Sequence, residues 1–144
     1  MAWQMHRGKG YYIAAIILLL AGTTVYILFR DGVAIVEWAR QWLGIGTTLR
    51  IEQRTLHYFV AYCLSDALWY AALLLTQRAL LDTSRQSLLL FYLSVALPYL
   101  LETAQWMNIM PGTFDWLDIA TYTIIAIPFI VTTHSNERHS ISRR

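Results

Sequence analysis

Two neighbouring stretches of this chain place strongly polar residues inside or directly beside apolar segments. In the first stretch, Pro98, Glu102 and Gln105 recur four and three residues apart, so a helix carries them on one face. In the second, Asp115 and Asp118 stand at the start of another apolar run. A carboxylate within a membrane-spanning helix costs about 2.5–3.5 kcal/mol, so each of these acids needs a proton, a partner or a bound cation.

A further acid, Asp66, lies near the middle of a different apolar segment. Clustered carboxylates can share a proton, bind a cation or hold a cationic headgroup. If a metal is bound, we predict Glu102, Asp115 and Asp118 as ligands and Mg²⁺ or Ca²⁺ as the ion, because both prefer oxygen. Structural explanations stay open: Asp115 and Asp118 can cap a helix, and Glu102 with Gln105 can hydrogen-bond to a neighbouring helix.

Four apolar segments, each long enough to cross a bilayer as a helix, must position these residues. Hydrophobic residues make up 57% of the 144 residues and charged residues only 14%, a balance typical of integral membrane proteins. We therefore predict a single all-α domain over residues 1–144, an integral membrane four-helix transmembrane bundle. Its predicted spans cover about 11–29, 56–77, 87–106 and 114–133.

A shorter helix is predicted over 33–43, between the first and second spans. It is too short to cross a bilayer, and it carries Ile35, Trp38 and Trp42 on one side before Gly44 ends it. This pattern is typical of an amphipathic interfacial helix at headgroup depth. The predicted interfacial anchors of the whole chain are Trp38, Trp42, Trp106 and Trp116.

Basic residues predict the orientation of the bundle. With a cytoplasmic N-terminus, the inner side holds Arg7, Lys9, Arg78, Arg85, Arg138, Arg143 and Arg144, and the outer side holds Arg30, Arg40, Arg50 and Arg54. This excess on the inner side favours a multi-pass protein of the bacterial inner membrane with both termini in the cytoplasm. The outer arginines share a leaflet with the acids, so the predicted ligand-binding set is Asp66, Glu102, Gln105, Asp115, Asp118, Arg50 and Arg54.

Several other chemistries are disfavoured. No stretch interleaves Lys and Arg with aromatic residues, so nucleic acid is not a predicted partner. Cys63 is the only cysteine, which excludes an intrachain disulfide and makes it a predicted apolar filler. His57 has no second His or Cys at ligand spacing, so zinc is not predicted. Ser65 has no His within a span to act as its base, so a catalytic role is not favoured.

The spacing Glu102-x-x-Gln105, followed by Gly112 and then by Asp118 ahead of an apolar segment, resembles the VanZ-like family of small bacterial membrane proteins. The likeness covers about the last third of the chain. Glu102, Gln105 and Asp118 match the family's pattern, whereas Tyr122 stands where that family often has Asn. The resemblance implies a setting in the cell envelope or in antibiotic resistance.

We therefore expect a binding or transport protein with an extracytoplasmic acidic pocket. Its expected ligand is a lipid headgroup, an envelope precursor, a cation or a small solute, with no organic cofactor. One alternative is a structural or accessory subunit of a larger membrane complex. Another is an oligomeric ion-conducting protein in which Asp66 faces a pore. The expected partners are accordingly membrane lipids, other membrane subunits or further copies of this chain.

Overall fold

The computed structural model describes residues 2–80 and 85–141, and over these residues the regular secondary structure is helical, without strands. An all-α fold is thereby confirmed. In chain order the helices are α1 (Ala2–Phe29), α2 (Ala34–Leu43), α3 (Arg54–Tyr58), the π-helix η1 (Phe59–Leu64), α4 (Ser65–Leu80), α5 (Arg85–Trp106) and α6 (Trp116–Ile141). α3, η1 and α4 follow one another without a break and make one continuous helical rod.

Among the residues that the structure describes, four helical stretches are long and apolar enough to cross a membrane, as the sequence predicts. They are Lys9–Phe29, Arg54–Leu80, Gln86–Trp106 and Trp116–Thr133. Two of these helices continue beyond the predicted spans, since α1 begins at Ala2 and α6 runs to Ile141. The extension of α6 contains neither Gly nor Pro, so no residue in it interrupts the helix.

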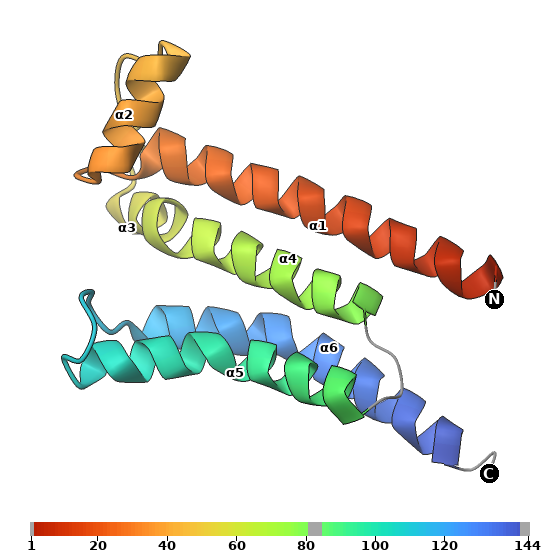
Figure 1. Ribbon diagram of the computed structural model, residues 1–144. Coiled ribbons are helices and arrows are strands. Elements are labelled where there is room, and N and C mark those ends of the chain that lie inside the picture. Colours follow the sequence, from red (N-terminus) through yellow and green to blue (C-terminus); the bar gives the residue numbers. More distant parts are fainter. Residues whose placement is uncertain (1, 81–84, 142–144) are drawn as a thin grey trace.

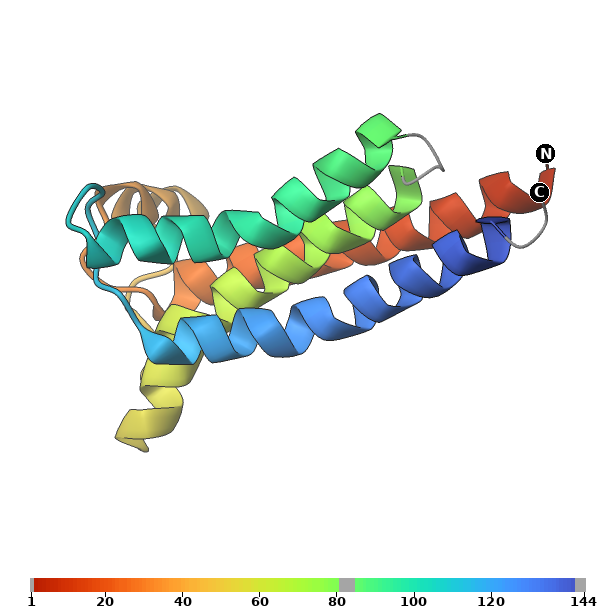
Figure 2. The ribbon, with the colours of Figure 1, turned by 90° about the horizontal axis from the view of Figure 1, so that it is seen from below.

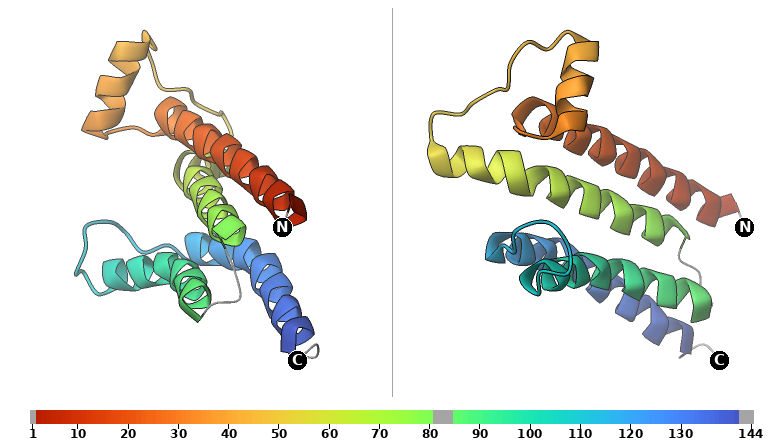
Figure 3. Two further views of the ribbon diagram at one scale, coloured as in Figure 1. Left: turned by 45° about the vertical axis from the view of Figure 1, so that its right-hand side comes forward. Right: turned by 60° about the vertical axis from the view of Figure 1, so that its left-hand side comes forward.

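α4 is the central helix of the bundle, because it contacts α1 on one side and α5 and α6 on the other (Figure 1). The N-terminal end of α1 and the C-terminal end of α6 lie at the same end of the bundle (Figure 2). The opposite end, called the loop end below, carries α2, the linker 44–53 and the loop 107–115. There α2 runs across the axis of α1 instead of along it (Figure 3).

A close approach of α1 to α4 depends on Gly22. A Cβ atom at this position would lie only 2.8 Å from Cδ1 of Trp69 and 3.1 Å from the carbonyl oxygen of Ser65. Small residues allow helix backbones to approach closely, which is how helices associate where water supplies no hydrophobic force. Gly22 therefore fixes the side of α1 that faces the Ser65 region of α4.

The main apolar core joins α4 and α6. Tyr70, Leu74, Tyr122 and Ala126 form a buried cluster, in which the rings of Tyr70 and Tyr122 meet edge to face at 5.3 Å. The Tyr70 hydroxyl donates a hydrogen bond to the carbonyl oxygen of Val95 on α5 at 3.1 Å. One buried aromatic residue thus ties three helices together just below the acids described next.

Candidate functional site

Acidic residues from three helical rods gather at the loop end of the bundle. Asp66 comes from the start of α4, Glu102 from the last turns of α5, and Asp115 and Asp118 from the start of α6. The charge of Glu102 lies within electrostatic range of all three aspartates. The acids that the sequence places on separate spans therefore form one cluster, called the acid cluster below.

Glu102 is the most buried member of the acid cluster, with 5% of its surface exposed. Its Oε2 atom accepts a hydrogen bond from the backbone N–H of Asp115 at 3.2 Å. This bond links the end of α5 to the residue that precedes α6, across the loop that joins them. Because the bond joins the two ends of the loop, Glu102 also helps to hold the loop in place.

Asp115 has two structural partners. Its Oδ1 atom accepts a hydrogen bond from the backbone N–H of Leu117 at 2.8 Å, so Asp115 caps the N-terminus of α6. Its Oδ2 atom accepts a hydrogen bond from the hydroxyl of Tyr58 at 2.7 Å, which ties α6 to α3. The capping explanation is thus correct for Asp115. Each oxygen keeps a lone pair for a further interaction.

Asp118 faces Cys63 across the contact between α6 and η1. One carboxylate oxygen from each of Asp115 and Asp118 and the Sγ atom of Cys63 all lie within 4.8 Å of one another. The Oδ1 atom of Asp118 is buried and has no hydrogen-bond partner among the residues that the structure describes. A buried carboxylate oxygen is normally satisfied, so this one is available to a ligand.

Asp66 lies within electrostatic range of Asp118 and of Arg30 at the end of α1. The hydroxyl of Ser65, which is fully buried, lies 3.4 Å from the Oδ1 atom of Asp66. The Arg30 guanidinium sits over the ring of Tyr62, with 4.3 Å between its central carbon and the ring centroid. Arg30 therefore supplies a positive charge beside the acid cluster, stabilised by an aromatic face.

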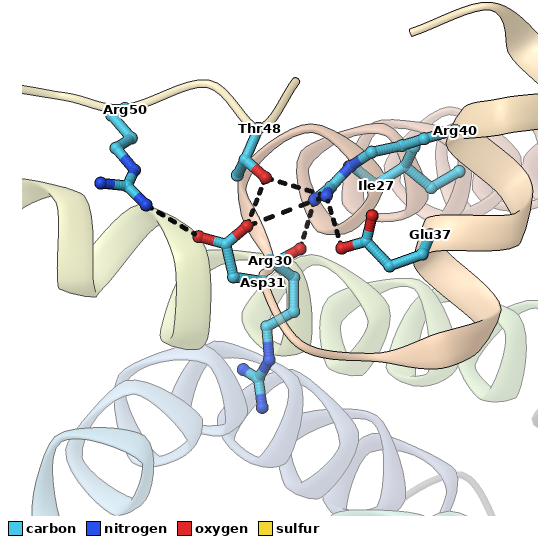
Figure 4. A network of polar contacts seen from close by, with 7 residues as sticks. All are labelled: Ile27, Arg30, Asp31, Glu37, Arg40, Thr48 and Arg50. Atoms are coloured by element: carbon cyan, nitrogen blue, oxygen red, sulfur yellow. Dashed lines mark hydrogen bonds and ion pairs between the residues drawn. The ribbon is translucent and has the colours of Figure 1, made fainter. Parts of the chain in front are cut away.

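The position of Arg30 depends on a network of polar contacts around Arg40, which lies on α2 (Figure 4). Arg40 is only 3% exposed. Its Nε atom donates to the carbonyl oxygen of Ile27 at 2.6 Å, and an Nη atom donates to the carbonyl oxygen of Arg30. Its other Nη atom donates to Glu37 at 3.0 Å and to Thr48 at 2.9 Å.

This network closes the corner between α1 and α2. The last carbonyl groups of α1 have no partner within the helix, and the buried guanidinium of Arg40 satisfies two carbonyls there. Figure 4 shows the Arg30 side chain pointing away from this network and toward α6. Arg40 thus holds the backbone of the corner in place, and the Arg30 side chain extends from this corner toward the acids.

The other predicted site residues are Arg50, Arg54 and Gln105. The Arg50 side chain is 81% exposed, pairs with Asp31 at 3.9 Å, and lines a hollow of about 470 Å³ between α2 and the linker. Arg54 is exposed at the start of α3. Gln105 packs against the loop, since a Cβ atom at Gly112 would lie 2.7 Å from its amide nitrogen. The structure therefore brings Asp66, Glu102, Asp115 and Asp118 together, and within the described part of the chain neither Arg50 nor Arg54 forms an ion pair with any of them.

The four predicted anchor tryptophans are all exposed, by 62% for Trp38, 77% for Trp42, 69% for Trp106 and 76% for Trp116. Trp38 and Trp42 lie on α2, and Trp106 and Trp116 flank the loop 107–115 as the last residue of α5 and the first of α6, so all four lie at the loop end (Figure 1). Exposed indole rings at one level of a bundle fit the predicted anchoring role, which stays a prediction.

Three contributors to the site escape the sequence-based prediction. Cys63 is buried in the cluster, Tyr58 orients Asp115, and Arg40, which is named there only as an outer basic residue, is buried. Two signals were present. Cys63 lies three residues before Asp66, and Val36, which is also buried, lies four residues before Arg40. Such spacings put each pair on one face of a helix.

Over the described ranges 2–80 and 85–141, the fold is an all-helical bundle with four helical stretches long and apolar enough to span a membrane, and the acid cluster lies at its loop end. No family model, curated protein or solved structure matches this chain. The resemblance of Glu102, Gln105 and Asp118 to the VanZ-like pattern stays a prediction.

Proposed function

We propose that this chain is a bacterial inner-membrane protein that binds or transports a cationic ligand at its acid cluster, on the extracytoplasmic side. The observation that carries the proposal is the convergence of acids from three helical rods around the buried Glu102 and the unpartnered Oδ1 atom of Asp118. An uncompensated group of buried acids is costly, whereas a bound cation offsets their mutual repulsion.

The charges of the described residues favour a cation over an anion. Four carboxylates gather in the cluster, and one guanidinium lies within electrostatic range of two of them. These residues are Asp66, Glu102, Asp115, Asp118 and Arg30. A metal ion, an ammonium headgroup or a cationic solute would each meet this balance, and an anionic headgroup would need Arg30 to be released from the acids.

Insertion into a membrane is supported by the outer surface of the bundle. Large apolar residues on it are strongly exposed, including Leu20 at 62%, Leu100 at 60% and Ile124 at 71%. Water-soluble proteins rarely expose contiguous apolar patches of this kind, whereas lipid tails would cover them. The exposed tryptophans at the loop end would then lie at the outer headgroup level, with α2 beside them.

Binding can be tested on the purified full-length protein. We would measure thermal unfolding in detergent with CaCl₂, MnCl₂ or ZnCl₂, and in lipid nanodiscs with and without phosphatidylethanolamine. A ligand that binds only the folded protein stabilises it by about 2.7 kcal/mol at 100 times its dissociation constant. We expect at least one probe to raise the unfolding temperature, and Asp118→Asn to abolish that rise.

A matched control separates the cluster from general charge effects. Glu52 is exposed in the linker outside the cluster, so Glu52→Gln should leave the ligand-induced shift unchanged, whereas Glu102→Gln should reduce it. If no probe gives a shift that depends on Asp118 or Glu102, cation binding at this site is rejected.

A second candidate function is that of an accessory subunit in a larger membrane assembly. The exposure of Trp38, Trp42, Trp106 and Trp116 at one end favours it, since aromatic residues are enriched at protein interfaces. Purification in mild detergent distinguishes the two. Stoichiometric copurification with a larger partner supports the subunit, and a lone protein or homodimer that binds a cation supports the first proposal.

A further inference from the structure

We propose that the cation of the acid cluster is a divalent metal ion of the zinc class, held by the Cys63 thiolate together with Asp115 and Asp118. The inference rests on the proposed function and names its ligand class. It departs from the Mg²⁺ or Ca²⁺ expected from the acids alone, because the structure adds a sulfur atom to the group of candidate ligand atoms.

The geometry of the three groups suits a small metal site. The Sγ atom of Cys63 and one oxygen from each aspartate lie within 4.8 Å of one another. Zinc binds sulfur at about 2.3 Å and oxygen at about 2.0–2.2 Å, so a tetrahedral ion keeps its ligand atoms about 3.5 Å apart. The three ligand atoms would therefore have to approach one another by at most about 1.3 Å to close around an ion.

Two further observations point to a ligand at this place. The Oδ1 atom of Asp118 is buried without a hydrogen-bond partner among the described residues, and the Sγ atom of Cys63, a residue with 1% of its surface exposed, lies within 4.8 Å of one oxygen of the same carboxylate. The hydroxyl of Tyr58 and the backbone N–H of Leu117 hold the Asp115 carboxylate in place. Oriented carboxylates of this kind are typical of metal ligands, whose partners fix them before the ion arrives.

The donor set selects the ion. A thiolate favours zinc and its chemical relatives over Mg²⁺ and Ca²⁺, which prefer oxygen ligands alone. On binding, the Cys63 S–H bond breaks heterolytically, its proton goes to water, and the thiolate forms the bond to the metal. Three protein ligands leave the fourth tetrahedral position to water or to an exogenous ligand.

A titration of the purified full-length protein with CdCl₂ and CoCl₂ tests this inference by absorption spectroscopy. Cys63 is the only cysteine of the chain, so a thiolate-to-metal charge-transfer band can arise from no other residue. We expect a band that saturates at one ion per chain, that ZnCl₂ abolishes by competition, and that excess MgCl₂ or CaCl₂ leaves intact. Bound zinc should also slow the alkylation of Cys63 by N-ethylmaleimide, which requires a local opening of the fold because this thiol is only 1% exposed.

Variants separate the ligands from the surroundings. Cys63→Ser should remove the band, Asp118→Asn should weaken Cd²⁺ binding by at least about 10-fold, and Tyr58→Phe should weaken it by about 10-fold. Glu52→Gln is the matched control and should bind Cd²⁺ like the unaltered protein. If Cys63→Ser fails to fold, Asp118→Asn and Tyr58→Phe still test the inference, because both retain the thiol that reports binding.

The outcomes distinguish this inference from the proposed function. Absence of a charge-transfer band, together with absence of zinc protection against alkylation, overturns the zinc-class site. If Ca²⁺ or Mn²⁺ then still stabilises the protein in a way that depends on Asp118, the cation-binding function stands and the ion is a hard one. A Cd²⁺ band that is unaffected by Asp118→Asn also overturns the proposed ligand set.

Discussion

Replacing Arg40 by alanine should loosen the corner between α1 and α2 more than any replacement of an exposed charge in the same network. Arg40 is buried and donates hydrogen bonds to the carbonyl oxygens of Ile27 and Arg30, and to the side chains of Glu37 and Thr48. Alanine removes every one of these donors and leaves the two carbonyl groups at the end of α1 without their partner.

The magnitude follows from the partners. A hydrogen bond from a charged donor contributes about 1.5–3 kcal/mol, so the two bonds to carbonyls set an upper bound of about 6 kcal/mol. The carboxylates contribute less, because Glu37 and Asp31 side chains are 51% and 44% exposed and water can replace their pairing. Water can partly hydrate the two freed carbonyl groups, which lowers the expected loss of stability further. We expect Arg40→Ala to destabilise the fold by about 3 kcal/mol, and Arg40→Lys by about half of that, since an ammonium lacks the planar fork.

Equilibrium unfolding of the purified protein in detergent, followed by far-ultraviolet circular dichroism, measures the change in free energy. Hydrogen–deuterium exchange of peptides that cover 27–48 localises it. Glu37→Gln is the matched control, because it alters the same network at an exposed position, and it should cost less than about 1 kcal/mol. Equal losses for Arg40→Ala and Glu37→Gln would show that Arg40 does not hold the corner.

Three further predictions concern the bundle itself. Glu102→Gln keeps an acceptor for the Asp115 N–H and should change stability by less than about 1 kcal/mol, whereas Glu102→Ala removes the acceptor and should cost about 2–4 kcal/mol in the same unfolding assay. Gly22→Val should push α1 away from α4, because the added side chain would clash with Trp69, and it should lower the free energy of unfolding by about 1–3 kcal/mol. A lowered unfolding temperature or an increase in tryptophan fluorescence would detect the change. Tyr70→Phe removes the bond to α5 and should cost about 0.5–1.5 kcal/mol, and an unchanged unfolding temperature would contradict that role.

Much of the helical architecture was predictable because it is local. The length and polarity of an apolar run are enough to identify a helix that can span a membrane, so the four spans were predicted within a few residues over most of their bounds. The capping role of Asp115 was also predictable from local sequence, since an aspartate before an apolar run can accept hydrogen bonds from free N–H groups in the first turn of the helix.

The membership of the site was only partly predictable. The sequence-based prediction grouped Glu102, Asp115 and Asp118 because they are close in sequence, and these three residues lie close together in the structure. It also assigned Arg50 and Arg54 to the site because they share its end of the bundle. The structure pairs Arg50 with Asp31, and a contact of Arg50 or Arg54 with a ligand stays a prediction.

The sequence by itself determined that the chain forms four long apolar helices and that most of its acids lie toward one end of them. Hydrophobic length and helical period act within each segment, so neither depends on the other segments. Only the tertiary structure decided that Cys63 faces Asp118 and that Arg40 is buried against the end of α1. Those contacts depend on how far each helix is rotated about its own axis, which is set by packing against helices that lie far away along the chain.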